Sequence, residues 1–114
     1  MKVKSDNLHT SGIEYFFNPK SIAIVGASKN LTKFGGRPIG ALLKKKYTGT
    51  IYPINRRYKE IAGLTCYPSV HDVPGEIDFA IISVPIERTL EALQQCAEKG
   101  VKAAVVFTSG FAET

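Results

Sequence analysis

Short runs of apolar residues alternate with glycine, proline and charged residues along the chain. Five of these runs are rich in β-branched side chains and end at turn-forming residues, as strands do. The predicted strands are Ser21–Val25, Thr50–Ile54, Leu64–Tyr67, Asp78–Pro85 and Lys102–Gly110. Because Pro53 removes a hydrogen-bond donor from the second strand, we expect the pairing of this strand to become irregular near its end.

Two longer segments carry apolar residues at helical spacing. The first runs from Pro38 to about Lys46, and the second runs from Glu87 to Lys99 and is capped by Gly100. The predicted apolar faces are Ile39, Leu42 and Leu43 in the first helix and Leu90, Leu93 and Ala97 in the second. A brief helix is also expected between Ser69 and Pro74.

Strands that alternate with helices and have continuous apolar runs are typical of a parallel sheet covered on both faces. Right-handed crossovers then predict a Rossmann-like, doubly wound α/β sheet with the strand order 3-2-1-4-5. All loops that follow strands meet at one edge of such a sheet, where ligands bind. Here those loops are Gly26–Arg37, Asn55–Lys59, Ser83–Pro85 and Thr108–Phe111.

A chain of 114 residues with 44% hydrophobic and 22% charged residues is typical of one globular domain, so we expect residues 1–114 to form a single unit. Since no helix follows the fifth predicted strand, we expect this unit to be the N-terminal part of a longer multidomain chain. The apolar runs are too short to cross a membrane and the first residues do not resemble a signal peptide, so a cytoplasmic location is predicted.

The net charge of +5 predicts an anionic partner. The basic residues are not interleaved with exposed aromatic residues and match no nucleic-acid motif, so we expect a small polyanion rather than nucleic acid. Cys66 and Cys96 lie 30 residues apart and fit no metal or redox spacing, so we expect two reduced core residues and no metal. His71 and the adjacent Asp72 face different ways on a helix, which disfavours a catalytic His-Asp pair. His71 is therefore expected at the surface.

Four of the ten glycines lie between Ala23 and Gly40, directly after the first predicted strand. Small residues at such a turn let backbone N–H groups approach phosphate oxygens, and the positive end of the following helix favours such contacts. The spacing departs from the dinucleotide-binding fingerprint, because the next glycine after Gly26 is Gly35, nine positions on, where the fingerprint has one two positions on.

The second predicted strand ends in Asn55, Arg56 and Arg57, without the acidic residue that binds ribose hydroxyls in dinucleotide sites. Arginines attract phosphate instead. The ligand should therefore carry a phosphate on or near its adenosine ribose, which leaves NADP or coenzyme A (CoA). If the two arginines continue the strand, only one of them faces the site.

Several phrases of the sequence occur in the order and spacing of one family; they are "NPKSIAIVGAS", "GGRP", "YPIN" and "GFAE". On these motifs, the stretch from Tyr15 to Thr114 resembles the N-terminal CoA-binding domain of nucleoside-diphosphate-forming acyl-CoA synthetases. That family includes the ADP-forming acetyl-CoA synthetases and is related to the α subunit of succinyl-CoA synthetase. The sequence departs from the family at Arg56, where proline commonly follows the asparagine.

The resemblance implies a CoA site built from the strand-end loops. The nucleotide and its phosphates would contact Gly26, Ala27, Ser28, Lys33, Phe34, Gly35, Gly36 and Arg37. The 3′-phosphate would be bordered by Asn55, Arg56 and Arg57, and which of the three meets it stays open. The adenine and the start of the pantetheine arm would be lined by Val84, Pro85, Thr108, Ser109 and Gly110. Ser83 is either a further site residue or a core hydroxyl bonded to its own backbone.

No catalytic residue is predicted in this chain. In the resembled enzymes a phosphohistidine carries the phosphoryl group and an ATP-grasp domain supplies the nucleotide site, and neither His9 nor His71 fits such a loop. We therefore expect the chain to hold CoA while further synthetase domains or a second subunit make acyl-CoA from an acid, CoA and ATP. The alternatives are a stand-alone CoA-binding or regulatory protein, the regulatory domain of a protein acyltransferase, or a fragment of an NADP-dependent oxidoreductase.

Overall fold

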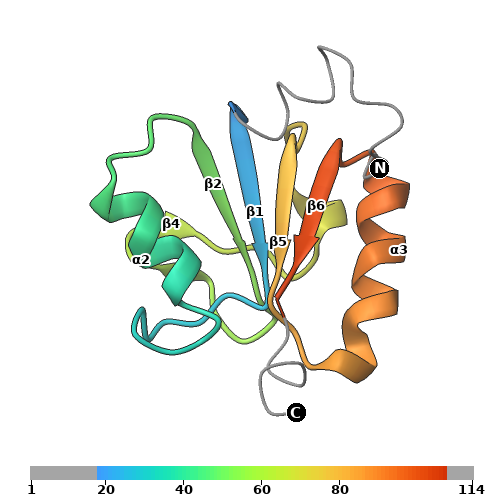
Figure 1. The fold of residues 1–114 in the computed structure, drawn as a ribbon, viewed down its shortest axis with the longest axis horizontal. Helices are drawn as coiled ribbons and strands as arrows, with labels where there is room; N and C mark the ends of the chain where they lie inside the picture. Colours follow the sequence, from blue (N-terminus) through green and yellow to red (C-terminus); the bar gives the residue numbers. More distant parts are fainter. Residues whose placement is uncertain (1–17, 108–114) are drawn as a thin grey trace.

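The computed structural model describes residues 18–107, so the predicted site residues Thr108, Ser109 and Gly110 lie outside the described part of the chain. Four parallel strands form one sheet in the order β2-β1-β5-β6 (Figure 1). The strands are β1 (Ser21–Val25), β2 (Thr50–Ile54), β5 (Phe79–Ile82) and β6 (Ala103–Val106). This order matches the 2-1-4-5 part of the predicted strand order. The central strand β1 pairs with β2 on one edge and with β5 on the other.

A hairpin replaces the first part of the third predicted strand. In it, β3 (Glu60–Ile61) pairs antiparallel with β4 (Leu64–Thr65), as a small sheet of its own. The two residues between them, Ala62 and Gly63, have φ angles of 53° and 80°. Two successive residues with positive φ are what a tight two-residue hairpin turn requires.

Only one residue of the third predicted strand reaches the edge of β2. Tyr67 forms a single parallel bridge with Ile54. Its N–H donates to the Pro53 carbonyl and its own carbonyl accepts from the Asn55 N–H, both at 2.9 Å. Because Pro53 has no N–H to donate along this edge, the ladder cannot extend, and the full order 3-2-1-4-5 is not confirmed.

Helices cover both faces of the sheet (Figure 1). On one face lies α2 (Arg37–Lys44), and on the other lie α3 (Thr89–Lys99) and two short 3₁₀ helices, η2 (Val70–Asp72) and η3 (Ile86–Arg88). The buried cluster under α2 contains Ile22, Ile24, Ile39 and Ile51. The cluster under α3 contains Ala23, Ala80, Ile82, Ala92 and Cys96. Successive residues of β1 thus serve opposite cores, as in a doubly wound sheet. No helix within residues 18–107 has the length and apolar character that a bilayer crossing needs.

The predicted helix faces are confirmed in part, because Ile39 is buried and Leu42 and Leu93 pack against the two cores. The face that α3 turns to the sheet contains Ala92 and Cys96, whereas Leu90 is 68% exposed. On α2, Leu43 is also exposed. Ala92 and Cys96 belong to the cluster beneath this helix, whereas Leu90 does not. The cap was predicted correctly, because Gly100 has a φ of 88° and its N–H donates to the Cys96 and Ala97 carbonyls at 3.1 Å.

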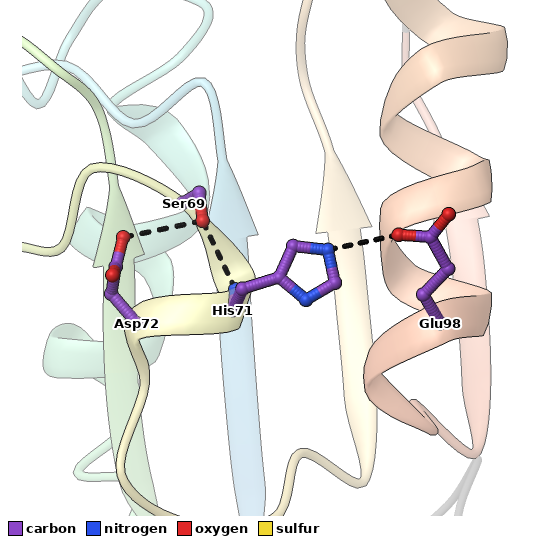
Figure 2. Close-up of polar contacts among 4 residues, drawn as sticks. All are labelled: Ser69, His71, Asp72 and Glu98. Carbon is purple, nitrogen blue, oxygen red and sulfur yellow. Dashed lines mark hydrogen bonds and ion pairs between the residues drawn. The ribbon is translucent and has the colours of Figure 1, made fainter.

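A polar contact connects η2 to α3 (Figure 2). Ser69 caps η2, since its Oγ accepts the His71 N–H at 3.1 Å and lies 3.2 Å from Asp72 Oδ2. His71 Nε2 lies 3.1 Å from Glu98 Oε1 on α3. The His71 side chain is 45% exposed, which confirms the predicted surface position. An exposed pair of this kind contributes little stability.

Both cysteines are free and buried, as expected from the sequence. Burial raises the pKa of the Cys96 thiol to about 11, and burial also raises the pKa of Cys66. Because the thiolate is the reactive form, we expect iodoacetamide at about pH 8 to label neither cysteine in the folded protein and both in urea. Mass spectrometry counts the added groups. Labelling of Cys96 at the same rate with and without urea would contradict this account.

Candidate functional site

A pocket of about 560 Å³ lies where the loops after β1, β2 and β5 meet one side of α3, and its volume is in the range of ligand sites. The predicted site residues that line it are Gly26, Ala27, Ser28, Lys33, Phe34, Gly35, Asn55, Arg56, Arg57, Ser83 and Val84. Gly36, Arg37 and Pro85 are not part of its lining. The structure thus brings three of the predicted loops together, while the contacts of these residues with a ligand stay a prediction.

Two glycines let the first loop fold tightly onto the ends of the strands. Gly26 has a φ of 88°, and a Cβ added to it would lie 2.4 Å from the Ser83 carbonyl oxygen. A Cβ added to Gly35 would lie 2.4 Å from the carbonyl oxygen of Gly26. Both distances are far below van der Waals contact. The two positions therefore require glycine because backbone packs against backbone there.

The first N–H groups of this loop are already engaged within the protein. Gly26 and Ala27 N–H donate to the Ile54 carbonyl at 3.0 and 3.1 Å, and Ser28 N–H donates to the Gly35 carbonyl at 3.2 Å. In this conformation these three N–H groups therefore have acceptors within the protein. Among the described residues, the N–H groups of Phe34 and Gly35 have no acceptor, and both residues line the pocket. The free N–H donors of the loop that line the pocket thus lie in its second half.

Asn55 holds the glycine loop against the end of β2. Its Nδ2 donates to the Ala27 carbonyl at 2.8 Å, and its Oδ1 accepts the Arg57 N–H at 2.8 Å. Both ends of the amide are thus occupied by protein groups. Of the three candidates for the ribose phosphate, Asn55 positions the loop, and the side chains of the two arginines have no hydrogen-bond or ion-pair partner among residues 18–107.

Arg56 and Arg57 both line the pocket from the turn that follows β2. The strand ends at Ile54, so the alternation that would turn one of them away does not apply. Neither arginine forms an ion pair with another residue in the 18–107 range. Two exposed and unpaired guanidinium groups therefore stand at one side of the pocket.

Sequence reasoning missed the wall that α3 contributes. Glu91, Ala92 and Gln95 of α3 line the pocket together with Arg88 directly before the helix, and Pro68 and Ser69 line it as well. The predicted site residues lie only in loops that follow strands. The helix after β5 begins at the same edge of the sheet, and its first turns lie beside these loops. With Lys33, Arg56 and Arg57, Arg88 makes four cationic side chains around the pocket against one carboxylate. A polyanionic ligand suits this balance.

Two alternatives were predicted for Ser83, a site residue or a core hydroxyl bonded to its own backbone. Its side chain is buried, but its Oγ has no hydrogen-bond partner among the described residues. The alternative of a core hydroxyl bonded to its own backbone is therefore wrong.

A doubly wound sheet with a cationic pocket at the carboxyl ends of its strands defines a domain that binds a nucleotide-like ligand. The family described as CoA binding domain matches residues 20–114. This chain belongs to that CoA-binding domain family.

Relatives of known name are similar over most of this chain. It is 45% identical over 102 residues to the ADP-forming acetate–CoA ligase II subunit alpha of Pyrococcus furiosus, covering 90% of this chain and 22% of that one. It is 48% identical over 103 residues to an ADP-forming acetate–CoA ligase of Methanocaldococcus jannaschii, covering 89% and 14%. A solved structure of acetyl-coenzyme A synthetase 1 from Ca. Korarchaeum cryptofilum superposes with a TM-score of 0.82 at 48% identity, covering 89% and 22%. The chain thus spans less than a quarter of the length of these relatives.

Proposed function

We propose that the pocket binds coenzyme A and that the domain does so as part of an ADP-forming acyl-CoA synthetase. One observation carries the proposal: the turn after β2 presents Arg56 and Arg57, and no carboxylate, to the pocket of the glycine loop. A ribose that carries a phosphate suits this arrangement, whereas free ribose hydroxyls need an acidic residue there. The family of the chain favours CoA over NADP as that ligand.

In this proposal the parts of CoA are assigned by charge and polarity. The 3′-phosphate meets Arg57, with Arg56 as the second candidate. The diphosphate meets Lys33 and the two free N–H groups that follow it in the loop. Val84 borders the adenine and the start of the pantetheine arm. Asn55 and the two packed glycines hold the loops that carry these contacts.

The domain holds CoA and does not itself form the thioester. His71 does not line the pocket and is engaged with Glu98 at the surface. We therefore assign acid activation to a phosphohistidine loop and an ATP-grasp domain in other parts of the enzyme. The complete enzyme joins a carboxylic acid to CoA and converts ATP to ADP and phosphate.

The chain of 114 residues is therefore expected to form no acyl-CoA from acetate, ATP and CoA. The reason is that the described residues lining the pocket include neither a phosphoryl-accepting histidine nor a nucleophile paired with a base. Chromatographic separation of CoA and acetyl-CoA measures the product. The Gly26→Ala variant, purified in the same way, controls for contaminating enzymes. Turnover by the wild-type chain above that of the variant would contradict this division of roles.

A further inference from the structure

Among the residues that the structure describes, two serines are buried, and the hydroxyl of one is hydrogen-bonded while that of the other is not. Ser21 is 8% exposed and Ser83 is 7% exposed. Ser21 Oγ donates to the Glu76 carbonyl at 2.8 Å and accepts the Asp78 N–H at 2.9 Å. Ser83 Oγ is closed off from solvent and has no partner among residues 18–107. A buried hydroxyl without a partner costs free energy in the ligand-free protein, so its retention calls for a reason.

Ser83 stands at the floor of the pocket, where β1 and β5 separate. Its N–H donates to the Val25 carbonyl at 2.7 Å, which continues the pairing of the two strands by one residue. Its carbonyl oxygen packs against Gly26, where an added Cβ would lie only 2.4 Å from it. Because β2 and β5 lie on opposite sides of β1, this is the point of the sheet where the winding direction changes. In doubly wound folds the diphosphate of a bound nucleotide crosses the sheet edge at this point.

Ser83 differs from the neighbouring backbone donors, because they have acceptors and its hydroxyl has none among the described residues. The N–H groups at the start of the glycine loop are engaged with the Ile54 and Gly35 carbonyls, so they cannot serve an anion at the pocket floor in this conformation. Ser83 lines the pocket, and no hydrogen bond holds its hydroxyl in the present rotamer. A turn about its Cα–Cβ bond therefore breaks no interaction within the described part of the chain.

We propose that Ser83 turns its hydroxyl into the pocket when CoA binds and donates a hydrogen bond to a diphosphate oxygen. The inference rests on the proposed CoA site and adds a residue that positions the diphosphate. A serine hydroxyl has one proton to donate, and a charged phosphate oxygen is a stronger acceptor than a neutral one. The bond that is missing in the ligand-free state is thus formed with the ligand.

Ser83→Ala and Ser21→Ala form a matched pair for the test. We expect Ser83→Ala to bind CoA and dephospho-CoA about tenfold more weakly, by the same factor, because both ligands carry the diphosphate. Without ligand, its melting temperature should equal or exceed that of the wild type. Ser21→Ala should melt at a lower temperature and keep the wild-type affinity for both ligands, because its hydroxyl serves only the fold.

Phosphorus NMR of the saturated complexes supplies a direct readout. The diphosphate signals of bound CoA should shift between wild type and Ser83→Ala, while the 3′-phosphate signal stays in place. Unchanged diphosphate signals, equal affinities of variant and wild type, or a loss confined to CoA would each overturn the role of Ser83 and leave the CoA site intact. A fall in melting temperature like that of Ser21→Ala would also overturn it. Absence of CoA binding by the wild type would instead remove the proposed function and this inference together.

Discussion

Replacing Gly26 with alanine is expected to lower the free energy of unfolding by about 3 kcal/mol or more and to remove detectable CoA binding. Two effects add at this position. Its φ of 88° is strained for any residue with a side chain, and the new Cβ would lie 2.4 Å from the Ser83 carbonyl oxygen. The carbonyl belongs to the backbone at the end of β5 and cannot move without shifting the pocket floor. Urea denaturation and calorimetric titration measure the two losses.

Gly100→Ala is the matched control for this variant. Gly100 has the same φ of 88°, but a Cβ added to it meets nothing within 4 Å. Its replacement should therefore cost only the strain of the left-handed backbone, about 1 kcal/mol, and leave CoA binding unchanged. Equal losses of stability in the two variants would show that the contact with Ser83 does not constrain the loop.

The double variant Arg56→Ala/Arg57→Ala is expected to bind CoA up to about a hundredfold more weakly, with little change for dephospho-CoA. A guanidinium group can meet a phosphate with two N–H donors, and dephospho-CoA lacks the phosphate in question. Of the single variants, Arg57→Ala should cause the larger loss. Added salt should reduce the ratio of the wild-type affinity for CoA to that for dephospho-CoA, because exposed ion pairs are screened. Titration of both ligands against the three variants measures these effects.

A control with the same loss of charge separates a specific contact from the net positive field. Lys44→Ala/Lys45→Ala removes two cations at the end of α2, and neither residue lines the pocket. It should leave the ratio of the two affinities at the wild-type value. If the arginine double variant also leaves this ratio unchanged, the 3′-phosphate binds elsewhere, and Lys33 or Arg88 becomes the better candidate.

The parallel sheet could be predicted because its strands are continuous apolar runs rich in β-branched residues. The third strand could not be predicted, because its pairing depends on the neighbouring strand β2. Pro53 has no N–H to donate at the edge of β2 with which Tyr67 pairs. The apolar face of α3 was predicted from the helical spacing of Leu90, Leu93 and Ala97, and of these Leu93 packs against the core. In the structure close packing favours Ala92 and Cys96, and the more hydrophobic Leu90 stays exposed.

The candidate site was predictable where it follows from topology. Loops after parallel strands share an edge, and this places Gly26, Lys33, Arg57 and Ser83 around one pocket. The contribution of α3 depends on how the helix is rotated, which the sequence pattern did not reveal. The sequence pattern also could not predict which individual side chains are hydrogen-bonded. That Asn55 is occupied and Ser83 Oγ is unpaired depends on distances between segments far apart in the chain.

The most direct test of the CoA site is a calorimetric titration of the chain with CoA, NADPH and NADH under the same conditions. The cationic turn after β2, joined to a glycine loop that lacks the dinucleotide spacing, predicts that CoA binds more tightly than either nicotinamide cofactor. NADPH binding as tight as that of CoA, or tighter, would contradict the account.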